Sequence, residues 1–249
     1  MNNKSIYVDS TNGQDVRSIF HSSSKGNIIF EGDGNVLYTT VGTTNGMGIF
    51  SSYGKDALIQ IKGKNLTSGL ENILFICPKC GKKYSFKAID NSLVCNDCGN
   101  TVIYNKYGFL EKTKDSDVIL DDEALWCEYQ KRQIMAQIKA KTYRLESNVS
   151  FYSNPNKEFK LELVGCGKLI FDIDSLKYIG TYLGEEIIKE FNLNILTQFP
   201  FSPNVRFNIP DDEGMLEFVP DNKQEVFEWA TCIDAYHTLK NEEKEDAAC

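Results

Sequence analysis

Four cysteines in two identically spaced pairs are the residues of this 249-residue chain that are best suited to chemistry. Cys77 and Cys80 form one Cys-x-x-Cys-Gly motif, Cys95 and Cys98 form a second one, and fourteen residues lie between Cys80 and Cys95. Zn²⁺ takes four soft ligands in a tetrahedron, and a hairpin between two such motifs brings four thiolates together. The glycine after each pair suits a tight turn that needs a positive φ. The sequence therefore predicts a four-thiolate zinc site.

Two disulfides, or four unrelated buried cysteines, are the alternatives to a metal site. The chain shows no secretory features, and paired Cys-x-x-Cys motifs in that context favour metal over disulfides. A closed shell of four thiolates leaves no open position for water or substrate, so the zinc is predicted to be structural and no catalytic residue is assigned. The remaining cysteines have no paired spacing and are interpreted as isolated thiols: Cys127, Cys166, Cys232 and Cys249.

Short β-prone runs flank both cysteine pairs and must position them. These runs are residues 73–76, 84–86, 93–94 and 101–104. Strands that enter and leave two cysteine turns are typical of a zinc ribbon, which we expect over residues 63–112.

Charge is distributed unevenly along the chain. The net charge of −8 argues against a general nucleic-acid binder, because phosphate contacts dominate that affinity. Residues 62–112 nevertheless hold eight lysines against four acids, and four of these lysines are expected on the first knuckle and its hairpin: Lys79, Lys82, Lys83 and Lys87. They form either a solvated face or a contact for an anionic phospholipid surface or a protein partner. Binding to nucleic acid or to the transcription machinery is a further alternative.

The rest of the chain divides into four segments. Residues 1–62 are β-rich, with strands expected at 5–8, 27–30, 36–41 and 58–61 and a short helix at 15–21. Residues 113–148 hold a linker helix, over about 121–144, with Asp121 or Asp122 as its N-cap. Residues 149–240 form a β domain, and residues 241–249 are a charged tail that we expect to be disordered.

The C-terminal β domain shows a period of two in its apolar residues. Strands are expected at 159–163, 168–173, 176–182, 187–193, 205–209 and 215–219. One amphipathic helix follows, with Asn222 as its cap and Glu225 three residues later. Six antiparallel strands closed by one helix resemble the pleckstrin-homology and GRAM-like architecture. The predicted fold class is α+β, mostly β.

No apolar run approaches the roughly 20 residues that a membrane span needs, and no signal-peptide pattern follows Met1. We therefore expect a cytoplasmic protein, with peripheral contact to a membrane as one option.

Several segments resemble the region after the catalytic domain of bacterial lysophospholipid (1-acyl-glycerol-3-phosphate) acyltransferases. These segments are residues 62–66, 69–72, the two cysteine motifs, 104–111, Trp126 with Gln130, 178–181, and 218–220 with Glu228 and Trp229. The resemblance covers about residues 60–240. It implies a non-catalytic module that is related to these enzymes and that docks to an anionic phospholipid surface or to a protein partner.

The catalytic motif of that family is missing from this sequence. In the family, a His-x-x-x-x-Asp motif supplies the general base and the carboxylate that orients it. Here His21 is followed five positions later by Gly26, and His237 by Glu242. An acyltransferase with an unrecognised site in residues 1–62, such as His21 with Glu31 or Asp33, stays the alternative, although about 60 residues are few for a catalytic core.

Overall fold

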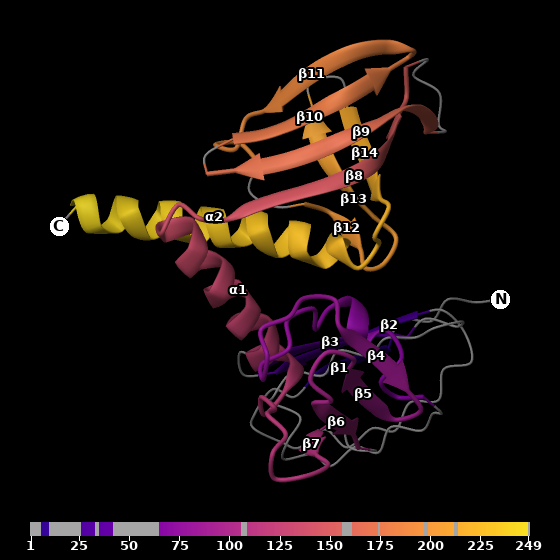
Figure 1. The fold of residues 1–249 in the computed structure, drawn as a ribbon, viewed down its shortest axis with the longest axis vertical. Coiled ribbons are helices and arrows are strands. Elements are labelled where there is room, and N and C mark those ends of the chain that lie inside the picture. Colours follow the sequence, from indigo (N-terminus) through magenta and orange to yellow (C-terminus); the bar gives the residue numbers. More distant parts are fainter. Residues whose placement is uncertain are drawn as a thin grey trace. The chain divides into compact units, whose positions relative to one another are not determined.

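The computed structural model describes residues 6–9, 26–32, 35–41, 65–105, 109–155, 161–173, 175–196, 199–211 and 214–248 (Figure 1). These residues are mostly β, with two α-helices, which confirms the α+β, mostly β class predicted from the sequence. The chain divides into two compact units, Met1–Glu128 and Tyr129–Cys249. The division falls inside the first helix, within the segment that the sequence analysis interpreted as a linker.

A small sheet of the first unit consists of β1 (Ile6–Asp9), β2 (Gly26–Gly32) and β3 (Asn35–Val41), in that order. β2 and β3 pair antiparallel, whereas β1 runs parallel to β2. The three strands confirm the β-prone runs in this part of the sequence. The parallel pair was not predicted, because it needs a crossover connection and not a hairpin. The expected strand at 58–61 and the expected helix at 15–21 lie outside the described residues.

The second sheet of this unit carries the cysteine motifs. It is antiparallel, in the order β4 (Phe86–Ile89), β5 (Ser92–Cys95), β6 (Thr101–Tyr104) and β7 (Leu110–Lys112). Strands were correctly expected close to β4, β5 and β6, and β7 was not predicted. Alternate residues of β5 and β6 are buried, including Leu93 and Val102, so one face of this sheet packs against a core.

The apolar run at residues 73–76 is buried, as its composition suggested, but it is not a strand. The 3₁₀ helix η2 (Leu70–Asn72) precedes it, and the amides of Ile73 and Leu74 both donate to the Leu70 carbonyl. Only Ile76 makes a β-bridge, with Lys83. The prediction of a strand here was wrong because local turn hydrogen bonds use the backbone groups that a ladder would need.

Helix α1 (Glu123–Lys139) begins where the sequence predicted a cap. The Asp122 carboxylate accepts a hydrogen bond of 2.8 Å from the Leu125 amide, which makes Asp122 the N-cap. The Trp126 indole N–H donates to the carbonyl of Ile76 at 2.9 Å, and its ring meets Phe86 edge to face. The first turns of α1 are therefore fixed to the backbone immediately before Cys77. The helix ends at Lys139, about five residues earlier than expected.

The second unit is built on one antiparallel sheet of seven strands (Figure 1). Its order is β11-β10-β9-β8-β14-β13-β12. The strands are β8 (Arg144–Ser153), β9 (Glu162–Asp172), β10 (Ser175–Tyr182), β11 (Glu185–Phe191), β12 (Phe201–Ser202), β13 (Arg206–Asp211) and β14 (Gly214–Pro220).

The strand count differs from the expected six. The runs 159–163 and 168–173 contribute to one long strand, β9, and the short β12 was not predicted. β8 was missed as well, although alternate residues along it are buried. Two of its inward positions are Ser147 and Ser153, so the apolar alternation on which the prediction relied is interrupted there.

Helix α2 (Glu225–Ala248) follows the last strand and shares a buried core with the sheet. The Trp229 indole N–H donates to the Ser147 hydroxyl at 2.8 Å, and the Tyr143 hydroxyl donates to Glu228 at 2.8 Å. Asn222 caps the helix start, as predicted, by accepting from the Gln224 amide at 3.3 Å.

The charged segment that we expected to be a disordered tail from residue 241 continues α2 to Ala248. Charge pairs support this extension of the helix. Glu242 pairs with Lys139 of α1 at 3.1 Å, and Glu243 pairs with Lys240 at 3.3 Å along α2 itself.

Candidate metal centre

The two cysteine motifs have the same backbone geometry. In the first, the Gly81 amide donates to the Cys77 carbonyl at 2.8 Å, and the Cys77 amide donates to the carbonyl of Lys82 at 2.9 Å. The second motif repeats this pattern. The Gly99 amide donates to the Cys95 carbonyl at 2.9 Å, and the Cys95 amide donates to the Asn100 carbonyl at 2.8 Å. Both glycines have positive φ, 72° and 66°, as the sequence predicted. Each turn thereby directs two thiols to one side.

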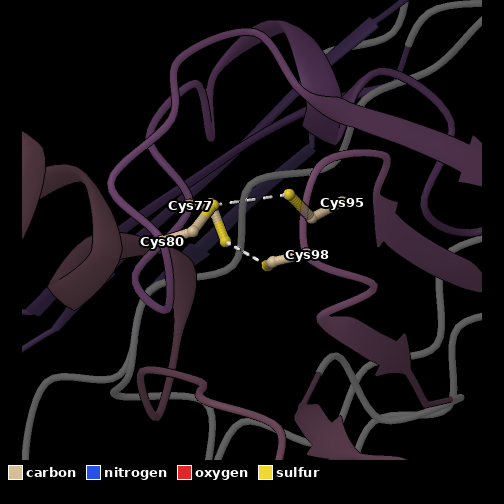
Figure 2. A group of neighbouring side chains, drawn as sticks. All are labelled: Cys77, Cys80, Cys95 and Cys98. Carbon is tan, nitrogen blue, oxygen red and sulfur yellow. Dashed lines mark hydrogen bonds between the residues drawn. The ribbon is translucent and has the colours of Figure 1, made fainter.

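The four thiols converge on one point, as Figure 2 shows. All four Sγ atoms lie within 4.8 Å of one another. The Sγ atoms of Cys77 and Cys98 are 3.7 Å apart, and those of Cys80 and Cys95 are 3.8 Å apart. A tetrahedral ion with metal–sulfur distances of about 2.3 Å places its thiolates about 3.8 Å apart, so the cluster fits such an ion. The structure therefore brings together all four predicted ligands in an arrangement that could hold a metal ion.

None of the four thiols forms a disulfide bond. Without a metal ion, the protein surroundings favour the protonated form of two of them, Cys77 and Cys95. Burial raises the pKa of the Cys77 thiol and, to a smaller extent, that of the Cys95 thiol. At Cys98 burial acts in the same direction, but the backbone of Asn100 and the neighbouring thiols lower the pKa overall. A bound cation would stabilise all four thiolates, because a coordinating thiol is deprotonated.

Side chains around the cluster hold the second motif in place. The Ser85 hydroxyl donates to the Asp97 carboxylate, and the Asn96 amide donates to the Ser85 carbonyl at 2.8 Å. Asn100, which is fully buried, exchanges two hydrogen bonds of 2.8 Å with the backbone of Val118. These contacts restrict the position of the ligands, as groups around a metal site commonly do.

The lysines predicted on the first motif lie where the sequence suggested. Lys79 and Lys82 are exposed within the turn, and Lys87 is exposed on β4. None of these three forms an ion pair with another described residue. Lys83 is half-buried next to the turn, opposite Ile76. Three exposed lysines without an acidic partner among the described residues therefore lie on the first cysteine turn and on β4.

A buried acidic group near the start of α1 was not anticipated as a special position. Glu123 is fully buried, and neither carboxylate oxygen has a hydrogen-bond partner among the described residues. Burial raises its pKa to about 7, and the charge of Asp122 acts in the same direction. The Tyr104 pKa is raised by burial and then by the charge of Glu123. No pattern in the sequence indicated this burial, since an acid in the first turn of a helix is ordinarily exposed.

The other candidate residues lie apart from the thiol cluster. Cys127 is half-buried on α1, where burial and then Glu123 and Asp122 raise its pKa to about 12. Cys166 is exposed on β9, and Cys232 is buried on α2. His237 contacts the Leu196 carbonyl through its Nε2 and packs edge to face on Tyr236, as a structural histidine would. In the alternative acyltransferase site expected within residues 1–62, His21 and Asp33 lie outside the described residues. Cys249, the last of the isolated thiols, lies outside them too.

Neither the family models nor the curated proteins give a match to this chain. In the part of the chain that the structure describes, no helix is long and apolar enough to cross a membrane. Fold and site together define a mostly β protein that carries a four-cysteine cluster able to hold a metal ion.

Proposed function

We propose that this chain is a non-catalytic docking module in which Cys77, Cys80, Cys95 and Cys98 hold a structural zinc ion. The observation that carries the proposal is the pair of sulfur–sulfur distances, 3.7 and 3.8 Å, across two turns with the same backbone hydrogen bonds. Zinc is the ion of choice for four thiolates in a closed tetrahedron, and such a shell keeps no position for substrate.

The antiparallel strands β4, β5 and β6 support a zinc ribbon. β4 follows the first cysteine turn, β5 ends at Cys95, and β6 follows the second turn. Metal binding would fix both turns at once, and the binding free energy would stabilise this small sheet. The ion would therefore hold structure and take no part in a reaction.

The strand order of the second unit supports a pleckstrin-homology-like domain. If β8 is taken as the first strand, the order is four-three-two-one-seven-six-five, and one long helix follows the last strand. A meander whose first strand also pairs with the last is the arrangement of that fold, and the likeness is one of architecture only.

Metal content tests the first part of the proposal. Purified protein should contain one zinc ion per chain by elemental analysis. The double variant Cys77→Ser with Cys95→Ser should lose the ion and melt at a lower temperature. Cys166→Ser is the matched control, because its thiol is exposed and outside the cluster. A metal-free wild type, or an unchanged melting temperature in the double variant, would contradict the proposal.

The docking surface of the first unit would be the three exposed lysines of the first turn and β4. Lys79, Lys82 and Lys87 present positive charge that no described acid neutralises, and an anionic phospholipid surface attracts such groups. Flotation with phosphatidylserine-containing vesicles should recover the wild type at low salt. Lys79→Gln with Lys82→Gln should reduce the recovery several-fold.

The control for flotation is Lys112→Gln with Lys141→Gln, which removes the same charge from exposed positions elsewhere. Equal recovery of the two double variants would remove the membrane version of the proposal. Binding to a protein partner, the other option that the sequence raised, would then be the remaining form of docking.

We further propose that the chain is related to the bacterial lysophospholipid acyltransferases. The support for this is the set of segments between residues 60 and 240 that resemble the region after the catalytic domain of those enzymes. An acyltransferase assay on lysophosphatidic acid tests the enzymatic alternative. Activity that is lost in His21→Ala would establish that alternative, and equal rates in variant and wild type would dismiss His21 as its base.

A further inference from the structure

The second unit contains a pocket of about 230 Å³ at one end of its sheet. Its apolar wall consists of Phe151, Tyr182, Ile187 and Leu216, which come from four different strands or strand ends. Phe151 and Leu216 are almost completely buried, so the pocket reaches the core. A drug-sized ligand needs about 300 Å³ or more, so this pocket suits a single inserted side chain.

The polar part of the pocket is an ion pair across the gap between two strands that are not hydrogen-bonded to each other. Lys189 of β11 lies 2.9 Å from Asp211 of β13, and both side chains line the pocket. Because these two charges neutralise each other, the pocket interior offers no net charge to a ligand. An apolar side chain is therefore better suited to it than a charged one.

The mouth of the pocket, in contrast, is acidic. Glu162 is the cross-strand partner of the pocket residue Ser153, and Glu185 is the partner of Tyr182. Residues directly opposite each other in a sheet share a face, so both carboxylates lie on the pocket side at the strand ends. Both are exposed, and neither is in an ion pair with another described residue.

The hairpin between β10 and β11 adds to the acidic character of the mouth. Glu186 follows Glu185 there and is exposed as well. An apolar side chain is exposed immediately after the pocket residue Tyr182: Leu183 is 60% exposed. A surface that combines exposed apolar groups with a single sign of charge is characteristic of a binding site for a partner of the opposite sign.

We propose that this end of the seven-stranded sheet binds a basic peptide segment of a partner protein, which inserts one apolar side chain between Phe151, Tyr182 and Leu216. The flanking lysines or arginines of the segment meet Glu162 and Glu185. Leu183, in the turn next to Tyr182, covers the inserted side chain from outside. The acidic mouth disfavours an anionic membrane as its ligand. Its residues belong to the second unit, whereas the exposed lysines and the four cysteines belong to the first. Binding of the peptide is therefore expected to be independent of the metal.

The probe for this site is the peptide Lys-Lys-Phe-Lys-Lys, titrated into the full, isotope-labelled protein and followed by amide NMR shifts. Saturable shifts are expected at Ser153, Tyr182 and Ile187. Two matched peptides, one with Gly for Phe and one with Glu for all four lysines, should bind at least about tenfold more weakly. Vesicles of phosphatidylserine should cause no shift at these three amides.

Variants of exposed carboxylates test the mouth without disturbing the core. Glu162→Gln with Glu185→Gln should weaken peptide binding about tenfold at low salt, whereas Glu190→Gln with Asp221→Asn, which makes the same change at other exposed positions, should leave it within about twofold. Absence of saturable shifts, equal affinity in the two double variants, equal binding of the glycine peptide, or shifts at these amides with vesicles alone would each overturn the proposal. The zinc content of the same samples reports separately on the proposed function.

Discussion

Glu123 has the most unusual surroundings of any ionisable side chain described in the first unit. It begins α1, where an acid would ordinarily face solvent and the positive end of the helix dipole. Here it is fully buried, close enough to Tyr104 and Cys127 that its charge raises the pKa of both groups. Burial of a carboxylate without a partner is costly, and the raised pKa of about 7 expresses that cost.

This burial predicts how stability depends on pH. Between the ordinary value of 4.5 and about 7, folded Glu123 keeps a proton that the unfolded chain has lost. The free energy of unfolding of this unit should therefore fall as the pH rises through that window, by up to about 3 kcal/mol, and Glu123→Gln should remove this fall.

Urea denaturation between pH 5 and pH 8 measures the effect of Glu123. Trp126 fluorescence can report on the first unit if Trp229→Phe is introduced into every protein compared. Asp121→Asn is the matched control, since Asp121 is exposed in the same acidic run. If the wild type and Glu123→Gln lose stability in parallel with rising pH, the carboxylate is not responsible.

The difference between the cysteines and Glu123 shows which residues a sequence reveals. The four cysteines were predictable because their spacing is a property of the turns themselves, and the structure brings all four together. The position of Glu123 depends on how the start of α1 packs, through Trp126, onto the backbone of Ile76, fifty residues earlier in the chain. Ser153, Lys189 and Asp211 were not predicted for a similar reason, because they come from three strands that are not adjacent in the sheet.

At the scale of the elements, β9 and β10 approach each other more closely than side chains would allow. Gly167 pairs with Gly180, and a Cβ atom added at Gly167 would lie 2.3 Å from the carbonyl oxygen of Ile179 and 2.6 Å from the Gly180 Cα. Both obstacles are backbone atoms, so no side chain can move aside. The glycines therefore permit the local approach of two strands in the middle of the sheet.

Replacing Gly167 should accordingly destabilise the second unit. We expect Gly167→Ala to lower the free energy of unfolding by about 2 kcal/mol or more, because the added methyl group forces the backbone of β10 to shift. Cys166→Ala, at the exposed neighbouring position of the same strand, should change it by less than about 0.5 kcal/mol. Thermal unfolding followed by circular dichroism compares the two variants, and similar losses in both would argue against the close approach.

β8 is a strand that could not be predicted from the sequence. β13, in which Phe207 and Ile209 alternate with polar residues, was found from the sequence, whereas β8 places Ser147 and Ser153 on its inward face. Ser147 is needed there because its hydroxyl bonds both Trp229 and Glu225 of α2. In the sequence, a serine such as Ser147 looks like a loop residue. Its hydrogen bonds to α2 can be recognised only once the fold is known.

At the scale of the whole molecule, we expect the two units to depend on the metal to different degrees. The sheet β4 to β7 is small, and its two cysteine turns depend on four thiols that an ion would hold together. The seven-stranded sheet has a core of its own, in which the rings of Phe151 and Phe207 both stack on that of Phe218. Two compact units with separate sources of stability need not unfold together.

Removal of the metal should therefore affect one unit selectively. A strong chelator at mildly acidic pH should speed amide hydrogen exchange in residues 76–104 at least about tenfold and leave exchange in β8, β9 and β14 nearly unchanged. Hydrogen exchange with mass spectrometry measures both regions in one sample, and added zinc should restore the protection. Uniform loss of protection in both units would show instead that the metal supports the entire fold.

The sheet of the second unit ends at β11, whose only hydrogen-bonded neighbour among the described strands is β10. The free N–H and C=O groups of such an edge can recruit an identical edge from another molecule, and the exposed Ile188, at 69%, would favour that contact. Glu185, Glu186 and Glu190 place like charges along this edge, so two copies that approach through β11 repel each other. The carboxylates that give the pocket its acidic mouth thus also help to keep the protein from self-associating into extended sheets.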